Sequence, residues 1–376
     1  MRLENVSTKE FLESLDEVGN AVSTKSPIPC LTSVYLKVND DKIILLGSDT
    51  NTAIKKVLFK EDENFNVIEN GECLVEYKLF KAILSKLNND LSVFYTKDNQ
   101  FVIENGKSVY RLNMINAEEY PKIEFKKLEN EIILKTEDLK SIISNVSFAC
   151  STSEKKPILT GVNFNCSNSE LNCVGTDTYR LAKFNLNLEN VNDVNFTFPR
   201  QSLIALDKII NKTKEEFITI LYDNKNEIVI NVDNVLYKTR LLDGNYPNTD
   251  KIFANTYSHK VKIDKQQLID IIDRLNVLAK VDINYCIVKI EFKNDGTLIV
   301  TSTNSQIGNA KETMEYSSDD KFDLTLACNS DFLIQALNSF NQELVEINLQ
   351  SELRPFCITS EENSNLIQIL LPVKVQ

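Results

Sequence analysis

The feature that most constrains this chain is an internal repeat with an interval of about 128 residues. Gly47-Ser48-Asp49-Thr50 returns as Gly175-Thr176-Asp177-Thr178, 128 positions later, and Pro29-Cys30-Leu31-Thr32 returns as Pro157-Ile158-Leu159-Thr160 at the same interval. A weaker match, at residues 299–304, lies 126 positions after residues 173–178 of the second copy. One short match could arise by chance, but ordered matches at one spacing indicate duplication. We therefore predict three copies of one domain, at residues 1–128, 129–257 and 258–376.

The length and composition agree with several globular domains. A chain of 376 residues exceeds what one hydrophobic core usually supports. Its hydrophobic fraction of 42% and charged fraction of 26% are ordinary for globular proteins. It has no apolar run of about 18 residues that could span a membrane, and its first residues carry acids where a signal peptide would be apolar. We expect a cytoplasmic protein.

The apolar pattern predicts two helices and several short strands in each copy. The expected helices start at Thr8 and Thr136 and cover 76–87, 200–211, 264–278 and 330–340. The expected strands are 34–38, 43–46, 91–96, 101–104, 109–114, 161–165, 171–174, 217–222, 227–232, 235–242, 288–292, 298–303, 344–349, 356–360 and 366–371. In the helix at 76–87 we expect Leu79 and Phe80 to face inward. This mixture indicates α+β domains with mainly antiparallel sheet, and we place linkers near 124–129 and 254–259.

Little in the sequence supports catalysis. The chain has nine glycines and no Gly-rich nucleotide-binding motif, P-loop or nucleophile elbow, and His259 is its one histidine. Asp49 and Asp177 recur at matched positions, which we interpret as turn-capping; a hydrolase that uses Asp177 is the rival hypothesis. The eight cysteines form no CxxC pair, so we expect buried free thiols, no zinc site and no cofactor.

Five segments carry a resemblance to a known family. They are Lys156-Pro157-Ile158-Leu159-Thr160-Gly161-Val162, Thr176-Asp177-Thr178-Tyr179-Arg180-Leu181-Ala182, Phe198-Pro199-Arg200, Leu242-Asp243-Gly244-Asn245-Tyr246-Pro247 and Leu370-Leu371-Pro372-Val373-Lys374-Val375. In this order, on a threefold repeat, the chain resembles the bacterial DNA polymerase III beta subunit, the sliding clamp, from end to end. The resemblance implies three tandem clamp domains that form half of a ring, which a head-to-tail homodimer closes.

The resemblance also implies a function without a reaction. Such a ring encircles duplex DNA, slides without sequence specificity and acts as the processivity factor of the replicative DNA polymerase. Its implied partners are duplex DNA, that polymerase, the clamp loader, repair polymerases, ligase and mismatch-repair factors. A net charge of −12 argues against binding DNA through an ordinary basic patch. A ring needs only weak local attraction to phosphates. The rival is a tandem-domain protein-interaction scaffold that never encircles DNA.

Three sets of site residues follow from the resemblance. Partner proteins would insert a short motif, with a leading Gln and trailing apolar residues, into a cleft between the second and third domains. The expected peptide-pocket residues are Leu159, Thr176, Thr178, Tyr179, Arg180, Leu181, Pro247, Lys251, Ile252, Leu353, Pro355, Ile369, Leu370, Leu371, Pro372, Val373, Lys374 and Val375. The expected DNA contacts are Lys25, Lys78, Arg200, Lys208 and Lys212. The expected dimer contacts are Tyr110 and Leu112 in the first domain and Val277 and Leu278 in the third.

Two of the three sets have a plainer alternative. Core packing explains Leu159, Leu181 and Leu370 as well as a pocket does. Lysines on a helix are usually only solvated. The helix at 330–340 has no Lys or Arg, so the three copies would not contact DNA equally.

Overall fold

The computed structural model describes residues 1–23, 26–60, 65–188, 193–223, 227–249, 252, 256–279, 286–304 and 308–374. The chain divides into two compact units, which are described separately. Unit 1 comprises Met1–Lys140 and Gln201–Leu241, and unit 2 comprises Ser141–Arg200 and Leu242–Gln376. The second of the three predicted copies therefore contributes to both units. The predicted copy boundaries at 128/129 and 257/258 stay predictions.

Unit 1 contains two antiparallel sheets. One has five strands in the order β5-β1-β7-β8-β9, and the other has eight in the order β10-β15-β16-β17-β4-β3-β2-β6. The strands are β1 (Arg2–Ser7), β2 (Ser33–Asn39), β3 (Lys42–Ser48), β4 (Thr52–Phe59), β5 (Asn66–Glu69), β6 (Gly71–Glu76), β7 (Leu91–Lys97), β8 (Gln100–Asn105), β9 (Ser108–Asn113), β10 (Asn130–Lys135), β15 (Phe217–Tyr222), β16 (Glu227–Val232) and β17 (Val235–Arg240).

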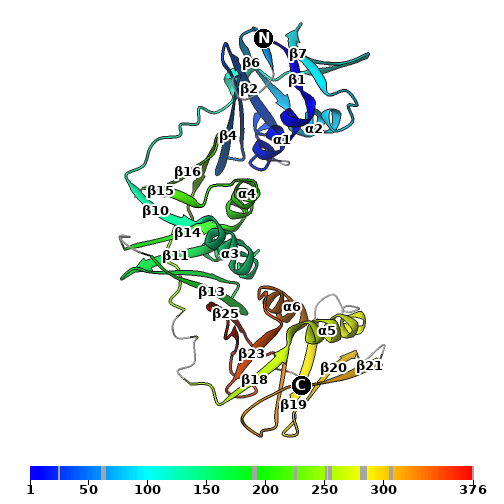
Figure 1. Ribbon diagram of the computed structural model, residues 1–376, viewed down its shortest axis with the longest axis vertical. Coiled ribbons are helices and arrows are strands. Elements are labelled where there is room, and N and C mark those ends of the chain that lie inside the picture. The colour runs from blue at the N-terminus through cyan, green and yellow to red at the C-terminus, as the bar shows by residue number, and fades with distance from the viewer. Residues whose placement is uncertain are drawn as a thin grey trace. The chain divides into compact units, whose positions relative to one another are not determined.

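The helical elements of unit 1 begin with α1 (Thr8–Gly19) and α2 (Tyr77–Leu84), which pack side by side (Figure 1). Two further helices, α3 (Thr136–Val146) and α4 (Arg200–Ile210), each cross a division between the units. Two short 3-10 helices are η1 (Pro29–Thr32) and η2 (Ala117–Glu119).

Unit 2 contains the other two sheets. An eight-stranded sheet has the order β14-β11-β12-β13-β25-β24-β23-β18, and a four-stranded sheet has the order β21-β20-β19-β22. The elements are β11 (Gly161–Ser167), β12 (Glu170–Thr176), β13 (Arg180–Asn187), β14 (Val194–Pro199), β18 (His259–Asp264), β19 (Ile287–Phe292), β20 (Thr297–Asn304), β21 (Gly308–Glu315), β22 (Leu324–Asn329), β23 (Leu344–Leu349), β24 (Phe356–Ser360), β25 (Asn363–Leu370), α5 (Lys265–Ala279), α6 (Ser330–Asn338), η3 (Ser147–Ala149) and η4 (Pro157–Thr160).

Each eight-stranded sheet joins strands from two neighbouring copies. In unit 1, β4 of the first copy pairs with β17 of the second, and Thr52 lies opposite Thr239. In unit 2, β13 of the second copy pairs with β25 of the third, and Arg180 lies opposite Leu370. Both pairings are antiparallel. Because β4 and β13 start 128 residues apart, the two junctions are built on equivalent strands.

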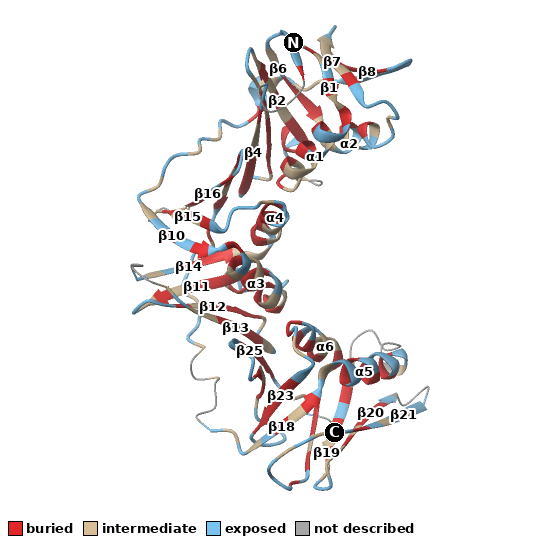
Figure 2. Cartoon of the chain, in the orientation of Figure 1, coloured by how far each residue is buried: buried red, intermediate tan, exposed pale blue. Residues whose placement is uncertain are grey.

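Helix α1 shows why the sequence folds this way locally. The Ser7 hydroxyl accepts a hydrogen bond from the Glu10 amide and caps the first turn. Phe11, Leu15 and Val18 then recur at helical spacing and are buried, while Lys9, Glu10 and Glu13 are exposed (Figure 2 colours the chain by burial). The apolar stripe therefore fixes which face of α1 packs inward.

Two glycines of the repeat let a helix approach a strand closely. A Cβ atom at Gly47 would lie 2.6 Å from the Val18 carbonyl oxygen, and one at Gly175 would lie 2.7 Å from the Val146 carbonyl oxygen. Gly47 and Gly175, like Val18 and Val146, are 128 residues apart. The matched glycines thus serve the same helix–strand contact in two copies.

Most predicted elements are confirmed. Two helices fall in each copy, and β15, β16, β23 and β24 have the predicted bounds. The expectation that Leu79 faces inward is wrong, because α2 is only eight residues long and buries Phe80 and Leu84, leaving Leu79 55% exposed. The predicted linker at 124–129 contains no helix or strand, and residues 254–255 of the other lie outside the described residues.

The cysteines are free, as expected. Seven are buried, and Cys286 is intermediate. The part of the chain that the structure describes brings together no group of three His, Cys, Asp or Glu side chains that could hold a metal ion. None of its helices is both long and apolar enough to cross a membrane.

Candidate functional site

The candidate site in unit 2 is built on the tight turn between β12 and β13. The Thr176 hydroxyl donates to the Arg180 carbonyl oxygen (2.5 Å) and accepts from the Thr178 amide (3.1 Å). Asp177 Oδ1 accepts from the amides of Tyr179 (2.9 Å) and Arg180 (3.0 Å). Thr178 has a φ of 79°, which is uncommon for a β-branched residue. Two short polar side chains hold this turn, and Tyr179 at its tip is 66% exposed.

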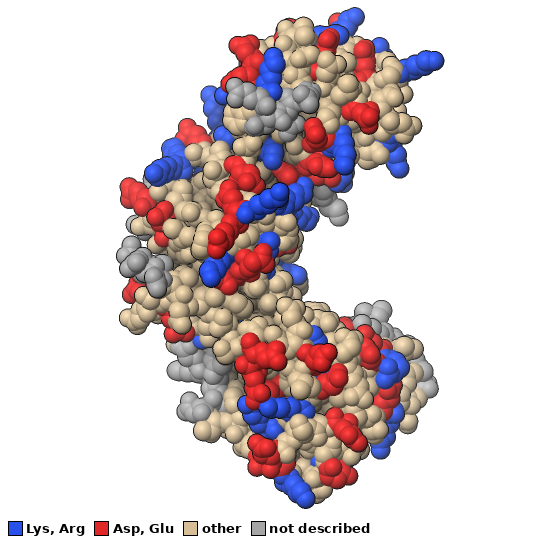
Figure 3. Space-filling model, viewed as in Figure 1, with Lys and Arg blue, Asp and Glu red and all other residues tan. Residues whose placement is uncertain are grey.

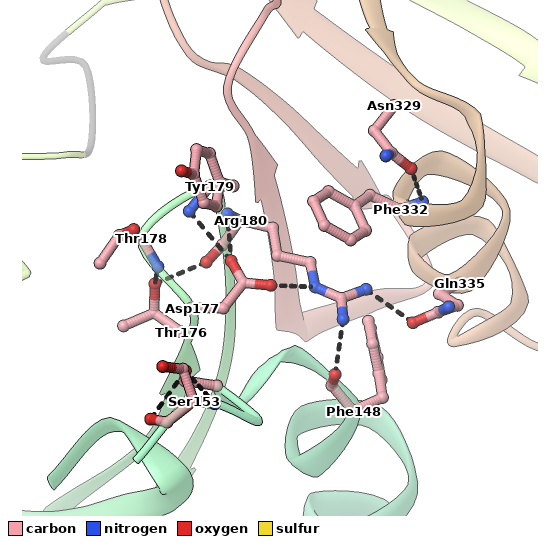
Figure 4. Close-up of polar contacts among 11 residues, drawn as sticks. Phe148, Ser153, Thr176, Asp177, Thr178, Tyr179, Arg180, Asn329, Phe332 and Gln335 are labelled. Carbon is pink, nitrogen blue, oxygen red and sulfur yellow. Dashed lines mark hydrogen bonds and ion pairs between the residues drawn. The ribbon is translucent and has the colours of Figure 1, made fainter. Parts of the chain in front are cut away.

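The Arg180 guanidinium connects the turn to two other elements (Figure 4). Its Nε donates to Asp177 Oδ2 at 3.0 Å. Its Nη1 donates to Gln335 Oε1 of α6 at 2.6 Å, and its Nη2 donates to the Phe148 carbonyl oxygen of η3 at 2.8 Å. The planar fork of arginine can make these three bonds at once, whereas lysine cannot. Arg180 therefore links the turn, η3 and α6.

Aromatic rings complete the surroundings of Arg180. Its guanidinium carbon lies 4.2 Å from the centroid of the Phe332 ring and 5.3 Å from that of Phe148. The Asn329 side chain caps α6 by accepting from the Phe332 amide at 3.0 Å, which fixes where the helix that carries Phe332 begins. Burial lowers the pKa of Arg180, and the neighbouring Asp177 carboxylate opposes this shift. Arg180 stays cationic at neutral pH.

The equivalent turn in unit 1 has the same construction. The Asp49 carboxylate accepts from two following backbone amides at 3.0 and 2.8 Å, and the Ser48 hydroxyl donates to the Thr52 carbonyl oxygen at 3.0 Å. Thr50 has a φ of 89°. The prediction that Asp49 and Asp177 cap turns is confirmed. Because both Asp177 oxygens already accept hydrogen bonds, the geometry does not favour Asp177 as a catalytic base.

The C-terminal segment runs from this turn to β22. The Leu371 amide donates to the Tyr179 carbonyl oxygen at 2.9 Å, and the Val373 amide donates to the Ala327 carbonyl oxygen at 2.7 Å. A pocket of about 440 Å³ lies beside this segment. It is lined by Leu353, Val373 and Lys374, which were predicted, and by Lys289, Thr325, Leu326, Ala327 and Glu352, which were not. Leu353 is 64% exposed, so the pocket presents uncovered apolar surface.

Several predicted pocket residues are buried in unit 2. The buried ones are Leu159, Thr176, Leu181, Ile369 and Leu370. Leu181 and Ile369 form a core cluster with Val174 and Cys357, against which Ile252 packs. Pro355, Pro372 and Val373 are half-buried, whereas Thr178 and Leu371 are exposed. The predicted residues therefore differ in exposure, and their common role in one pocket stays a prediction.

Of the predicted pocket residues, one lies at a different pocket and two fall outside the described residues. Pro247 lines a separate pocket of about 430 Å³, whose walls are rich in asparagine. Lys251 and Val375 fall outside the described residues.

The predicted DNA contacts differ in their surroundings. Lys78 is exposed on α2. In unit 1, Lys208 donates to Asn20 Oδ1 at 2.9 Å, and Lys212 lies 3.1 Å from Glu17. Arg200 is half-buried, and its Nε has no hydrogen-bond partner among the described residues. Lys25 falls outside the described residues.

The predicted dimer contacts lie on exposed apolar surface. Tyr110 and Leu112 belong to β9, an edge strand of the five-stranded sheet of unit 1. Tyr110 is exposed and Leu112 is half-buried. In unit 2, Val277 near the end of α5 is 75% exposed and Leu278 beside it is half-buried.

Comparison with protein families covers the chain from end to end. The models of the DNA polymerase III beta subunit match with its N-terminal domain at residues 3–124, its central domain at 133–248 and its C-terminal domain at 250–374. The beta sliding clamp of Staphylococcus aureus strain Mu50 is 30% identical over 369 residues, which are 97% of each chain. The chain belongs to the beta sliding clamp family.

Solved clamp structures agree with this assignment. The sliding clamp of Bacillus subtilis matches with a TM-score of 0.91 and 28% identity, and the DNA polymerase III beta chain of Streptococcus pneumoniae TIGR4 matches with 0.91 and 31%. Both matches cover 100% of each chain. The α+β fold of three clamp domains is therefore confirmed for this clamp.

Sequence reasoning missed part of the clamp's site. The residues Thr325 to Ala327 lie on β22, which was not predicted, although the run Leu324-Thr325-Leu326-Ala327 alternates as a strand would. Phe148 and Gln335 gave no local signal, because their role arises only when η3 and α6 meet Arg180.

Proposed function

We propose that this clamp is a DNA polymerase processivity factor that works in the cytoplasm as a homodimeric ring around duplex DNA. The observation that carries the proposal is the match to beta sliding clamps over 97% of the chain. The clamp itself performs no reaction; it tethers the replicative polymerase. The clamp loader, repair polymerases, ligase and mismatch-repair factors are its further proposed partners.

The charge distribution supports sliding in preference to tight binding. Acidic and basic side chains are interspersed on the face shown in Figure 3, and the net charge is −12. Lys212 is partly neutralised by Glu17, whereas Lys78 is exposed. Contacts to phosphates carry no sequence information, and each phosphate that a Lys or Arg neutralises adds to the affinity for DNA. A few exposed or half-neutralised cations, with Lys25 and Arg200 among the proposed contacts, therefore suit a ring that must move.

The pocket beside the C-terminal segment supports peptide docking. It offers exposed Leu353 and half-buried Val373 for apolar side chains, and the Arg180 network holds the turn at Tyr179 in place. Apolar pockets with a few convergent polar groups are typical ligand sites. We assign this pocket to the short apolar motif of the polymerase and of the other partners.

Retention on DNA circles tests the ring. The clamp is loaded by its clamp loader and ATP onto a covalently closed plasmid, and half of the sample is then cut once with a restriction enzyme. We expect the clamp to coelute with the circle in gel filtration and to be lost from the linear form. Equal retention on both forms, or none on the circle, would contradict enclosure; none on the circle with intact polymerase binding would favour the scaffold.

A further inference from the structure

Unit 1 contains a pocket of about 460 Å³, to which no role has been assigned. Leu31, Ala53, Pro121 and Ile123 give it an apolar floor, and Ile28 at its edge is exposed. Lys122, Lys238 and Arg240 line it together with Glu119, Glu124 and Glu227. Its volume falls in the range of small-ligand and peptide sites, which is roughly 300 to 1,000 Å³. We name it the unit 1 pocket.

The internal repeat relates the unit 1 pocket to the candidate site in unit 2. Its residues Ser48 and Thr50 to Ala53 correspond, at an interval of 128, to Thr176 and Thr178 to Leu181. It also uses Pro121, which follows Tyr120 as Pro247 follows Tyr246. Strand β17 supplies Lys238 and Arg240 beside β4, as β25 lies beside β13 in unit 2. The fold therefore repeats the surroundings of a binding turn.

Among the positions at which the two turns differ, one changes the charge. Where unit 2 has Arg180, unit 1 has Thr52, which is buried and shares hydrogen bonds with Ser202 (2.8 Å) and Thr239 (3.2 Å). The Thr52 side chain is uncharged and shares these bonds with hydroxyl groups on α4 and β17. The junction behind the unit 1 pocket is thus uncharged, and the cations lie on strand β17 and in the segment after Pro121.

The pairing of the lining charges leaves a cationic excess. Lys238 lies 3.0 Å from Glu227 and donates to the Glu124 carbonyl oxygen at 3.1 Å, and Glu124 pairs with Lys126 at 2.8 Å. The Arg240 and Lys122 side chains are exposed and have no ion-pair partner among the described residues. Of the lining acids, Glu119 alone lacks an ion pair within the described chain. Among the lining residues, two cations and one anion therefore have no ion pair within the described part of the chain.

We propose that the unit 1 pocket binds an extended peptide that presents an apolar side chain next to a carboxylate. The apolar residue occupies the floor at Leu31 and Ile123, and the carboxylate meets Arg240 and Lys122. A guanidinium can hold a carboxylate through two parallel hydrogen bonds, which gives the site a preference for an acid over an amide. The partner is a protein segment distinct from the Gln-led motif proposed for unit 2.

The test uses full-length clamp and two probes with amidated C-termini, acetyl-Leu-Phe-Glu-amide and acetyl-Leu-Phe-Gln-amide, in isothermal titration, so that only the first probe carries a carboxylate. A Leu353→Ala variant serves as the background, so that the candidate site in unit 2 contributes little. We expect the acidic probe to bind about tenfold more tightly than the amide probe, and Arg240→Gln to abolish that difference. Lys122→Gln is expected to reduce it in the same direction. Arg111→Gln, an exposed arginine on β9, is the matched control and leaves the difference intact.

Either of two outcomes overturns the proposal. One is the absence of a preference for the acid in the Leu353→Ala background. The other is a preference that survives both Arg240→Gln and Lys122→Gln. Retention of the clamp on circular DNA is measured in the same variants. A failure of the clamp to stay on the circle would count against the proposed function and not against the unit 1 pocket.

Discussion

At the scale of single residues, Arg180 is the side chain on which the candidate site in unit 2 most depends. It donates to a carboxylate, an amide and a backbone carbonyl, and two aromatic rings cover it. Its side chain is 11% exposed and that of Asp177 is 15% exposed. Removal of one partner from a buried ion pair leaves the other charge uncompensated. Arg180 therefore contributes to both stability and site geometry.

We predict that Arg180→Ala lowers the free energy of unfolding of unit 2 by about 3 kcal/mol, since it orphans Asp177 and the Gln335 amide oxygen. Arg180→Lys is expected to cost less, because lysine keeps one of the three bonds. Urea unfolding of both variants measures the loss, with Arg111→Ala on exposed β9 as the control. A loss for Arg180→Ala no larger than that of the control would show that the contacts carry no stability.

The buried thiols make stability depend on pH. Burial raises the pKa of Cys73, Cys150, Cys328 and Cys357 to about 12. In the unfolded chain these thiols ionise near pH 8.5, so the folded state holds protons that the unfolded state loses. The contribution is therefore fully present below about pH 8.5 and is lost as the pH rises toward 12.

We predict that the free energy of unfolding falls between pH 8 and pH 10, by about 2 kcal/mol for each of these thiols. Cys328→Ala removes one of them, so its stability falls less over the same interval, whatever the variant costs at pH 8. Urea unfolding at both pH values compares the two proteins. Equal losses in the variant and the parent would contradict the shift at Cys328.

At the scale of elements, matched glycines set the distance between a helix and a strand. Gly47 lies against the end of α1, and Gly175 lies against the end of α3. In both places the atom that a new Cβ would meet first is a backbone carbonyl oxygen, which cannot rotate away as a side chain can. The strand or the helix must then shift.

We predict that Gly47→Ala and Gly175→Ala each destabilise the protein by about 1 to 3 kcal/mol through overpacking. Ser144→Ala, an exposed position on α3, is the control and is expected to change stability by less than about 0.5 kcal/mol. Urea unfolding midpoints of the three variants provide the comparison. A neutral Gly175→Ala would mean that α3 moves away without cost.

The elements also show what the sequence could and could not predict. The sequence predicted the repeat and the bounds of β15, β16, β23 and β24, because the local alternation of apolar and polar residues determines these strands. Strand β13 was not predicted, although Ala182, Phe184 and Leu186 alternate as in a strand, and no local signal reports that it pairs with β25 of another copy. For the same reason the motif located the Thr176–Arg180 turn, whereas Phe148, Gln335 and β22 emerged only from the fold.

At the scale of the whole molecule, the proposed ring requires a second chain. The exposed apolar side chains Tyr110 and Val277 are the proposed contacts on the two units. Large exposed apolar side chains that gather at one site mark interaction surfaces. A head-to-tail interface closes when the rotation between the chains allows it.

We predict that light scattering at micromolar concentration gives twice the 42.9 kDa mass of one chain. Val277→Glu is expected to shift the protein toward the single-chain mass, because a buried unpaired charge is costly at an apolar contact. Leu344→Glu is the control, because Leu344 is another exposed apolar residue of unit 2, and this variant is expected to stay dimeric. A parent protein that is monomeric under these conditions would contradict the ring.

The shared eight-stranded sheets have a consequence for how this chain can be taken apart. Strand β4 lies between β3 and β17, and β17 comes from the next copy. A fragment that ends at residue 128 would keep β4 but lose β17, and the backbone of Thr52 to Lys56 would then be unpaired along a sheet edge. Such a fragment would be prone to aggregate. The duplicated copies, although alike, are not modules that can be excised one at a time.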